Sequence, residues 1–187
     1  MAALHHRYSG ASESALDQDL RACRLDDPIG MLLRNVRKDV GVFGAVAQDF
    51  KGGLIDKGAM FALYVSCRHR GLLDIFTGSK IVLQSNIDRH HILPKAQFSE
   101  KHKTTADTLA NIAFVSGSAN KSIGAAAPEV YVKEISPAVI RSQCLPSEEE
   151  LWRIDRAEEF WAERRKLLAE AFNDYLKTML PNRRIDA

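Results

Sequence analysis

The sequence contains little cysteine. Its 187 residues include only Cys23, Cys67 and Cys144, and no two of them form a C-x-x-C pair. A zinc ribbon needs such pairs, and a secreted disulfide framework needs a denser, even set, so the sequence disfavours both. The simpler interpretation is that all three are buried free thiols of a cytoplasmic protein.

Long apolar runs and a large excess of one charge are also missing. No apolar stretch approaches the roughly 20 residues that span a bilayer. The opening MAALHHRYSG has no signal-peptide core and no pattern typical of the start of a fold. The 26 Lys and Arg residues nearly balance 24 Asp and Glu, giving a net charge of +2. A surface that binds nucleic acid must therefore be local.

Helical patterns occupy most of the chain, whose 45% apolar and 27% charged residues are ordinary globular values. Capping residues followed by helical spacing predict helices within 9–25 and 26–38, and a third at 56–71. Residues 40–50 fit either a strand or a buried helix. Residues 127–135 predict another helix, with Pro128 near its first turn.

The C-terminal part is also helical in pattern. Ser147 and Glu150 fit a capping box, which predicts a helix start there. Apolar residues from Leu168 to Met179 mark one face of a long helix. The charged run 164–166 reads as part of its solvent-facing side.

The segment between these helices has a different residue pattern. Residues 79–93 are β-branched and predict one or two short strands, and 111–116 predict another. A polar connection, 94–108, separates them. A brief helix ending at Gly124 follows.

Histidine and asparagine gather in this segment at element boundaries. His90 and His91 are adjacent and precede Pro94, Asn111 follows His91 after 20 positions, and Asn120 follows after nine more. Taken alone, a His-His pair is more often structural than functional. A strand, a loop, a strand and a helix with polar residues at these points can converge on one cation and one phosphate, so the joint spacing favours a functional site.

The motifs around these residues resemble those of a known nuclease family. HHILP, NIAFVS, NKSIG and PEVYV, followed by EEFWAERRKLLAEAFNDYL, resemble in this order the ββα-metal (HNH) nuclease finger in the C-terminal domain of GmrSD-type restriction endonucleases. The resemblance implies an α+β, mostly α fold in which a helical domain carries a small finger. The implied parts are an N-terminal helical segment (1–78), the finger (79–124) and C-terminal helices (125–187), packed as one compact unit.

The resemblance also implies roles for particular residues. His91 is the general base and His90 a metal ligand, and Asn120 is a second ligand through its amide oxygen. Asn111 bonds backbone near the base and fixes the loop that aims it. Asp88, two residues before His90, is a further ligand or the acceptor that orients that histidine.

Other residues complete the expected site. Pro94 would stiffen the exit from the strand, and Lys95 and Lys121 would reach phosphate oxygens. The cofactor is a divalent metal ion, with Mg²⁺ or Mn²⁺ the first choice and Ni²⁺ or Zn²⁺ compatible with an imidazole ligand. His102 reads as a solvated loop residue that is also placed to approach DNA.

The function implied is a metal-dependent DNA endonuclease, nicking or cutting, that acts as the effector part of restriction or anti-phage defence in the cytoplasm. One alternative is a catalytically inactive module of the same fold that binds nucleic acid or a partner; a standalone RNase or toxin nuclease is a weaker one. The family's N-terminal Asp-Gly-Gln-Gln-Arg-type motif is absent. We therefore expect a separate sensor or NTPase-type domain or subunit as partner, and no membrane association.

Overall fold

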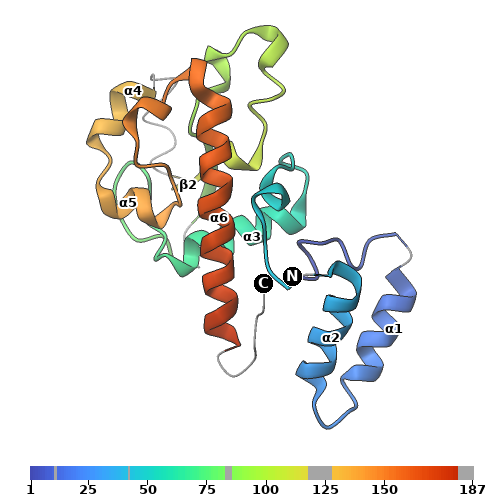
Figure 1. The fold of residues 1–187 in the computed structure, drawn as a ribbon. Coiled ribbons are helices and arrows are strands. Elements are labelled where there is room, and N and C mark those ends of the chain that lie inside the picture. Colours follow the sequence, from blue (N-terminus) through green and yellow to red (C-terminus); the bar gives the residue numbers. More distant parts are fainter. Residues whose placement is uncertain (11, 42, 83–85, 118–127, 181–187) are drawn as a thin grey trace.

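The computed structural model describes residues 1–10, 12–41, 43–82, 86–117 and 128–180. This part of the chain is mostly helical and contains one two-stranded antiparallel sheet (Figure 1), which confirms an α+β, mostly α fold. The elements are α1 (Ser12–Ala22), α2 (Pro28–Val40), α3 (Lys57–His69), β1 (Ile87–His91), β2 (Ile112–Ser116), α4 (Pro128–Tyr131), α5 (Pro137–Ser142) and α6 (Ala157–Met179). None of these helices is both long and apolar enough to cross a membrane.

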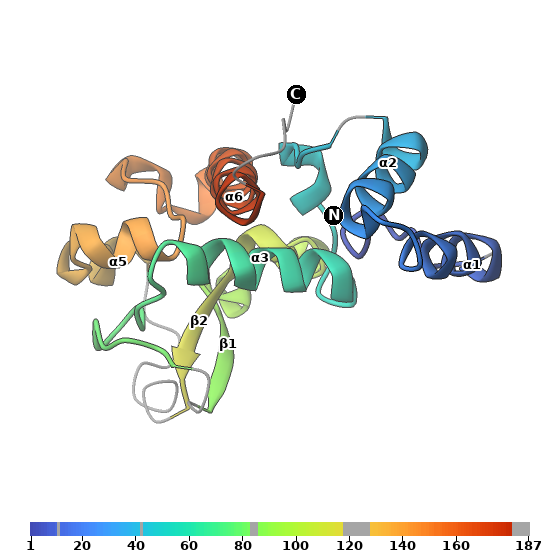
Figure 2. The same ribbon diagram turned by 90° about the horizontal axis from the view of Figure 1, so that it is seen from below.

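Helices α1 and α2 form a hairpin that stands to one side of the remaining elements (Figures 1 and 2). Pro28 occupies the first turn of α2, and the Asp27 carboxylate accepts a hydrogen bond from the Gly30 amide at 3.0 Å. This is the cap that the sequence pattern predicts, because a proline at the first turn lacks only an amide that the helix does not use.

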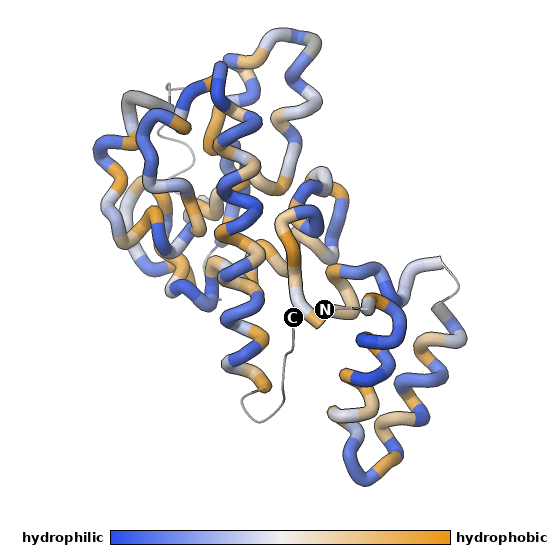
Figure 3. Tube along the Cα trace, viewed as in Figure 1, coloured by the Kyte–Doolittle hydropathy of each residue, from blue (hydrophilic) through white to orange (hydrophobic). Residues whose placement is uncertain are grey.

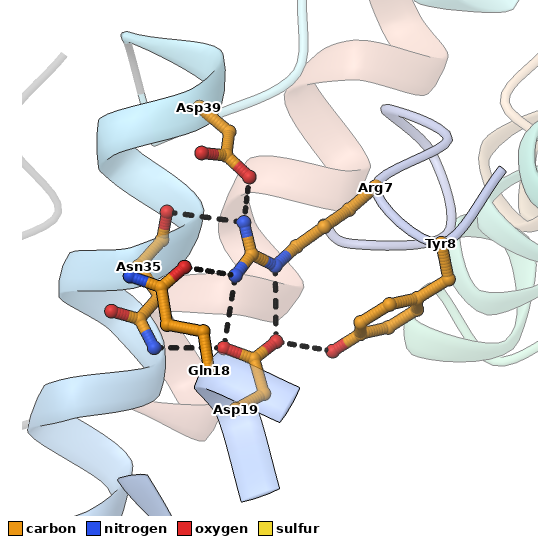
Figure 4. Close-up of polar contacts among 6 residues, drawn as sticks. All are labelled: Arg7, Tyr8, Gln18, Asp19, Asn35 and Asp39. Atoms are coloured by element: carbon orange, nitrogen blue, oxygen red, sulfur yellow. Dashed lines mark hydrogen bonds and ion pairs between the residues drawn. The ribbon is translucent and has the colours of Figure 1, made fainter. Parts of the chain in front are cut away.

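The first ten residues belong to the fold, contrary to the expectation from their sequence. Leu4 is buried, and so is Arg7, whose guanidinium donates to both oxygens of Asp19 at 3.0 Å and to the Asn35 carbonyl at 3.4 Å. Figure 4 shows this network, in which Tyr8 also donates to Asp19 at 2.6 Å. A buried guanidinium needs such partners, so the network fixes the N-terminal segment to the hairpin.

The main core lies where α3 crosses α6 (Figure 2). Leu63 and Cys67 of α3 pack in one buried cluster with Leu168 and Phe172 of α6. In Figure 3 the hydropathy colouring shows apolar and polar positions alternating along α6. Cys144 is also buried here, whereas Cys23 is exposed, so the expectation that all three thiols are buried is wrong for Cys23.

Some expected boundaries shift. Val40 is the last residue of α2, and the described residues from 41 to 50 contain neither a strand nor an α-helix, only a 3-10 turn at Ala47–Phe50. The helix predicted at 127–135 is reduced to α4 and a 3-10 turn.

The capping box at Ser147 and Glu150 is also wrong, because α6 begins only at Ala157. Trp152 is fully buried before that point and its indole N–H donates to the Pro146 carbonyl at 3.0 Å. Two 3-10 turns, Glu149–Leu151 and Ile154–Arg156, stand on either side of Trp152 before α6 begins.

Among the described residues the sheet has two strands, with His91 opposite Ile112 and Ile87 opposite Ser116. An isolated two-stranded sheet is marginal in water. Here buried side chains form hydrogen bonds with the edge of β2 that does not face β1. Gln143 pairs with the Phe114 backbone, accepting from its amide at 3.1 Å and donating to its carbonyl at 2.6 Å.

Asp74 and Arg164 bond the same edge of β2, where a third strand would otherwise pair. The Asp74 carboxylate accepts from the Ser116 amide at 2.6 Å, and Arg164 donates to the carbonyls of Ile112 at 2.6 Å and Ala110 at 3.0 Å. Arg164 is fully buried, so the reading of its charged run as solvent-facing is wrong at this position. Burial lowers the pKa of Arg164 to about 10. The sheet edge that leads into the candidate site is therefore held from three separate segments.

Candidate active site

The candidate site begins where β1 ends. His91 is the last residue of β1, and the next two residues, Ile92 and Leu93, are fully buried. Their burial anchors the exit from the strand, and Pro94 follows with an extended backbone before a 3-10 turn. The half-buried His91 side chain thus stands at the edge of a fixed strand end.

Asn111 clamps this strand end from the start of β2. It is fully buried, and its side-chain oxygen accepts from the Leu93 amide at 2.9 Å. Its amide nitrogen donates to the carbonyls of Leu93 at 2.9 Å and Ala106 at 3.0 Å. The Asn111 backbone carbonyl also accepts from the Ile92 amide at 2.8 Å. One side chain therefore ties the segment after His91 to the segment before Asp107.

Asp107 links His91 to Lys95. Its Oδ1 lies 3.0 Å from Nε2 of His91, and its Oδ2 forms an ion pair with the Lys95 ammonium. The side chains of His91 and Asp107 are 29% and 35% exposed, so solvent reaches the pair. The hydrogen bond from Lys95, with a further one from His91, lowers the pKa of Asp107 against the opposing effect of burial. Asp107 is consequently ionised at neutral pH.

His90 has different neighbours from His91. Its ring meets the Phe76 ring edge-on, with centroids 4.9 Å apart, and Phe76 in turn contacts Tyr131 at 5.9 Å. Tyr131 donates to the Ile92 carbonyl. Because β1 pairs regularly through His91 and then ends, the two adjacent rings leave it in different directions.

Asp88 shares its face of β1 with His90. A Cβ at Gly117 would lie 3.1 Å from Nδ2 of Asn86, a tight contact, and 3.5 Å from Oδ2 of Asp88, an ordinary van der Waals contact. Asp88 and His90 supply an oxygen and a nitrogen donor, a set that fits a divalent cation.

Two expected site residues, Asn120 and Lys121, lie outside the described residues. Within the described ranges, no three His, Cys, Asp or Glu side chains come together as a metal site. The expected ligand set depends on Asn120 for its third donor, so the described residues supply only part of it.

His102 lies on the connection between Lys95 and Asp107. It is exposed, and its Nδ1 is 2.9 Å from the Ser99 hydroxyl. Its ring is held by Ser99, three positions away along the same connection. His102 therefore offers a comparison histidine outside the His91 cluster.

Sequence reasoning missed Asp107 altogether. The residue stands in the polar stretch 94–108, where local pattern gives a carboxylate no distinction from the solvated residues around it. The available signal was its position, four residues before Asn111, on a chain that must return toward β1.

The family models, the curated proteins and the solved structures contain no match to this chain.

Proposed function

We propose that the chain is a metal-dependent HNH-type endonuclease domain that hydrolyses DNA phosphodiester bonds, with residues 79–124 as its ββα-metal finger. The observation that carries the proposal is the Asn111 clamp. It fixes the strand end that bears His91 and, through Ala106, the adjoining segment that bears Asp107. A half-exposed imidazole held beside a lysine is suited to proton transfer next to an anion.

Each residue would have a defined task in hydrolysis. A water oxygen attacks phosphorus as the bond from phosphorus to the leaving sugar oxygen breaks. His91 would take the proton from that water through a ring nitrogen. The Lys95 ammonium would balance the charge that grows on the phosphate oxygens. Asn111 would act as a positioning residue, because the hydrogen bonds of its side chain go to backbone groups.

Asp88 and His90 would hold the divalent cation together with Asn120. Mg²⁺ or Mn²⁺ suits the oxygen donors, and Ni²⁺ or Zn²⁺ suits the imidazole. When bound, the ion would supply positive charge for the leaving oxygen. Support for this assignment comes from the two donors, Asp88 and His90, which share one face of β1.

Supercoiled plasmid tests the proposal. The protein is incubated with Mg²⁺, Mn²⁺ or Ni²⁺, and nicked or linear product is measured for wild type, His91→Ala and His102→Ala. We expect product from wild type and His102→Ala and a loss of about 100-fold or more for His91→Ala, the range of a lost general base. Equal inertness of wild type and His91→Ala with every metal would exclude the enzyme.

A second candidate is a non-cutting module of the same fold that binds nucleic acid or a partner. One observation favours it: Asp107 already engages both His91 and Lys95, the two groups that would meet a phosphate. Calorimetry with Mn²⁺ separates the candidates. Binding that is lost in Asn120→Ala favours the nuclease, and no binding in wild type favours the module.

We further propose that this domain works in the cytoplasm as the effector of a restriction or anti-phage system. The net charge of +2 provides little general attraction for DNA. Targeting would then come from a sensor or NTPase-type domain or subunit. Tight sequence-specific binding of DNA by this chain alone would contradict the proposal that targeting comes from another domain or subunit.

A further inference from the structure

The Asp107 carboxylate is held in the way that a phosphate would be held. One oxygen lies 3.0 Å from Nε2 of His91 and the other pairs with the ammonium of Lys95. An imidazole and an ammonium that converge on two oxygens of one anion form a charge-assisted pair of contacts. A phosphate group presents the same features, two oxygens and negative charge, to the same donors.

The contact also determines which ring nitrogen carries a proton. An ionised carboxylate only accepts hydrogen bonds, so Nε2 must be protonated while Asp107 faces it. That nitrogen then cannot accept a proton from water. In a neutral ring the accepting nitrogen is Nδ1, which lies closer to the backbone of β1.

The position of Asp107 differs from that of an orienting carboxylate. In a serine-protease triad the aspartate is buried and binds the ring nitrogen that faces away from the substrate. Here the Asp107 side chain is 35% exposed and Lys95 is 42% exposed, so the carboxylate lies on the side open to solvent. This is the side from which a substrate would arrive.

The contact can also be replaced at low cost. Ion pairs that are this exposed contribute about 1 kcal/mol or less. Asn111 holds the neighbouring Ala106 carbonyl, so the backbone can remain in place while the Asp107 side chain rotates away. No rearrangement of the sheet is required.

We propose that in the free protein the Asp107 carboxylate occupies the phosphate position between His91 and Lys95, and that a substrate phosphate displaces it on binding. Displacement transfers the contacts of His91 Nε2 and of the Lys95 ammonium from the carboxylate to the phosphate. The proposal rests on the proposed function, because it identifies the displacing group as a phosphate of DNA. Asp107 therefore keeps the site masked until substrate arrives.

The direct test measures inorganic phosphate binding without metal, followed through the ¹⁵N signals of the His91 ring in the full chain. Asp107→Asn removes the charge and keeps the shape. Glu100→Gln is the matched control, because Glu100 lies on the same connection, is 86% exposed and pairs with Lys103. We expect phosphate to bind Asp107→Asn about three- to tenfold more tightly than wild type, and Glu100→Gln within about twofold. Asp107→Ser should agree with Asp107→Asn.

Equal or weaker phosphate binding by both Asp107 variants would overturn the proposal and identify Asp107 as part of the scaffold. Slower DNA cleavage by Asp107→Asn with unchanged phosphate affinity would also overturn it, because Asp107 would then orient His91. A short DNA duplex provides the second arm. Tightening for both ligands supports masking of a nuclease site. Tightening for inorganic phosphate alone supports displacement but contradicts the proposed DNA substrate, so the two proposals fail separately.

Discussion

Replacing Asn111 with alanine should destabilise the protein more than its size suggests. The change removes the partners of the Leu93 amide, the Leu93 carbonyl and the Ala106 carbonyl around a fully buried position. Each orphaned buried group costs about 1–3 kcal/mol. One water in the vacated space can serve some of them, so we expect a total loss of about 3–5 kcal/mol. That is a large share of the roughly 5–15 kcal/mol that stabilises a domain.

Urea unfolding followed by far-UV circular dichroism measures this loss. Asn173→Ala is the matched control, since Asn173 pairs with the backbone of Ala45 in a similar way, at 2.7 and 2.9 Å, in a half-buried position on α6. We expect a loss of about 1–2 kcal/mol for the control. Asn111→Asp should be at least as harmful as Asn111→Ala, because it places a carboxylate oxygen against two carbonyls. An Asn111→Ala variant no less stable than Asn173→Ala would contradict the claim that Asn111 holds this strand end in place.

Two further predictions concern the groups that support the site. Gln143→Met should leave the Phe114 amide and the carbonyls of Phe114 and Leu73 without their side-chain partner. We expect it to lower stability by about 2–4 kcal/mol and to speed hydrogen exchange at the Phe114 amide. Unchanged protection of that amide would count against Gln143 as the partner of this edge of β2. Burial opposes ionisation of Asp19, but its hydrogen bonds, led by that from Arg7, outweigh burial and lower its pKa. Asp19 therefore contributes stability above its unfolded pKa of about 3.9, and that contribution is lost as the pH falls through its lower folded pKa. Urea midpoints measured between neutral and strongly acidic pH should fall less steeply for Asp19→Asn, and parallel curves would argue against the network.

Local patterns in the sequence predict much of the frame of the site. The segments predicted as strands around His91 and after Asn111 form β1 and β2. β2 is a short continuous apolar run, and its first four residues are buried. Proline and aspartate place the start of α2 for an equally local reason. The apolar spacing from Leu168 onward lies on α6 as expected.

What the sequence could not predict are contacts between distant residues. Arg164 bonds carbonyls more than 50 positions away, and its charged neighbours hide the fact that it is buried. Gln143 completes a sheet edge 29 positions earlier, and Asp107 meets His91 across 16 positions. Each is an ordinary polar residue by local pattern, and only tertiary packing determines which of them meets a partner.

The most direct test of the central claim is the single-turnover rate of cleavage of a labelled DNA duplex in the presence of Mn²⁺, for wild type and His91→Ala. The account predicts cleavage by the wild type and a rate at least about 100-fold lower for the folded variant. Equal rates, or no cleavage by wild type with any of the four candidate metals, would contradict the assignment of His91 as the general base of a nuclease.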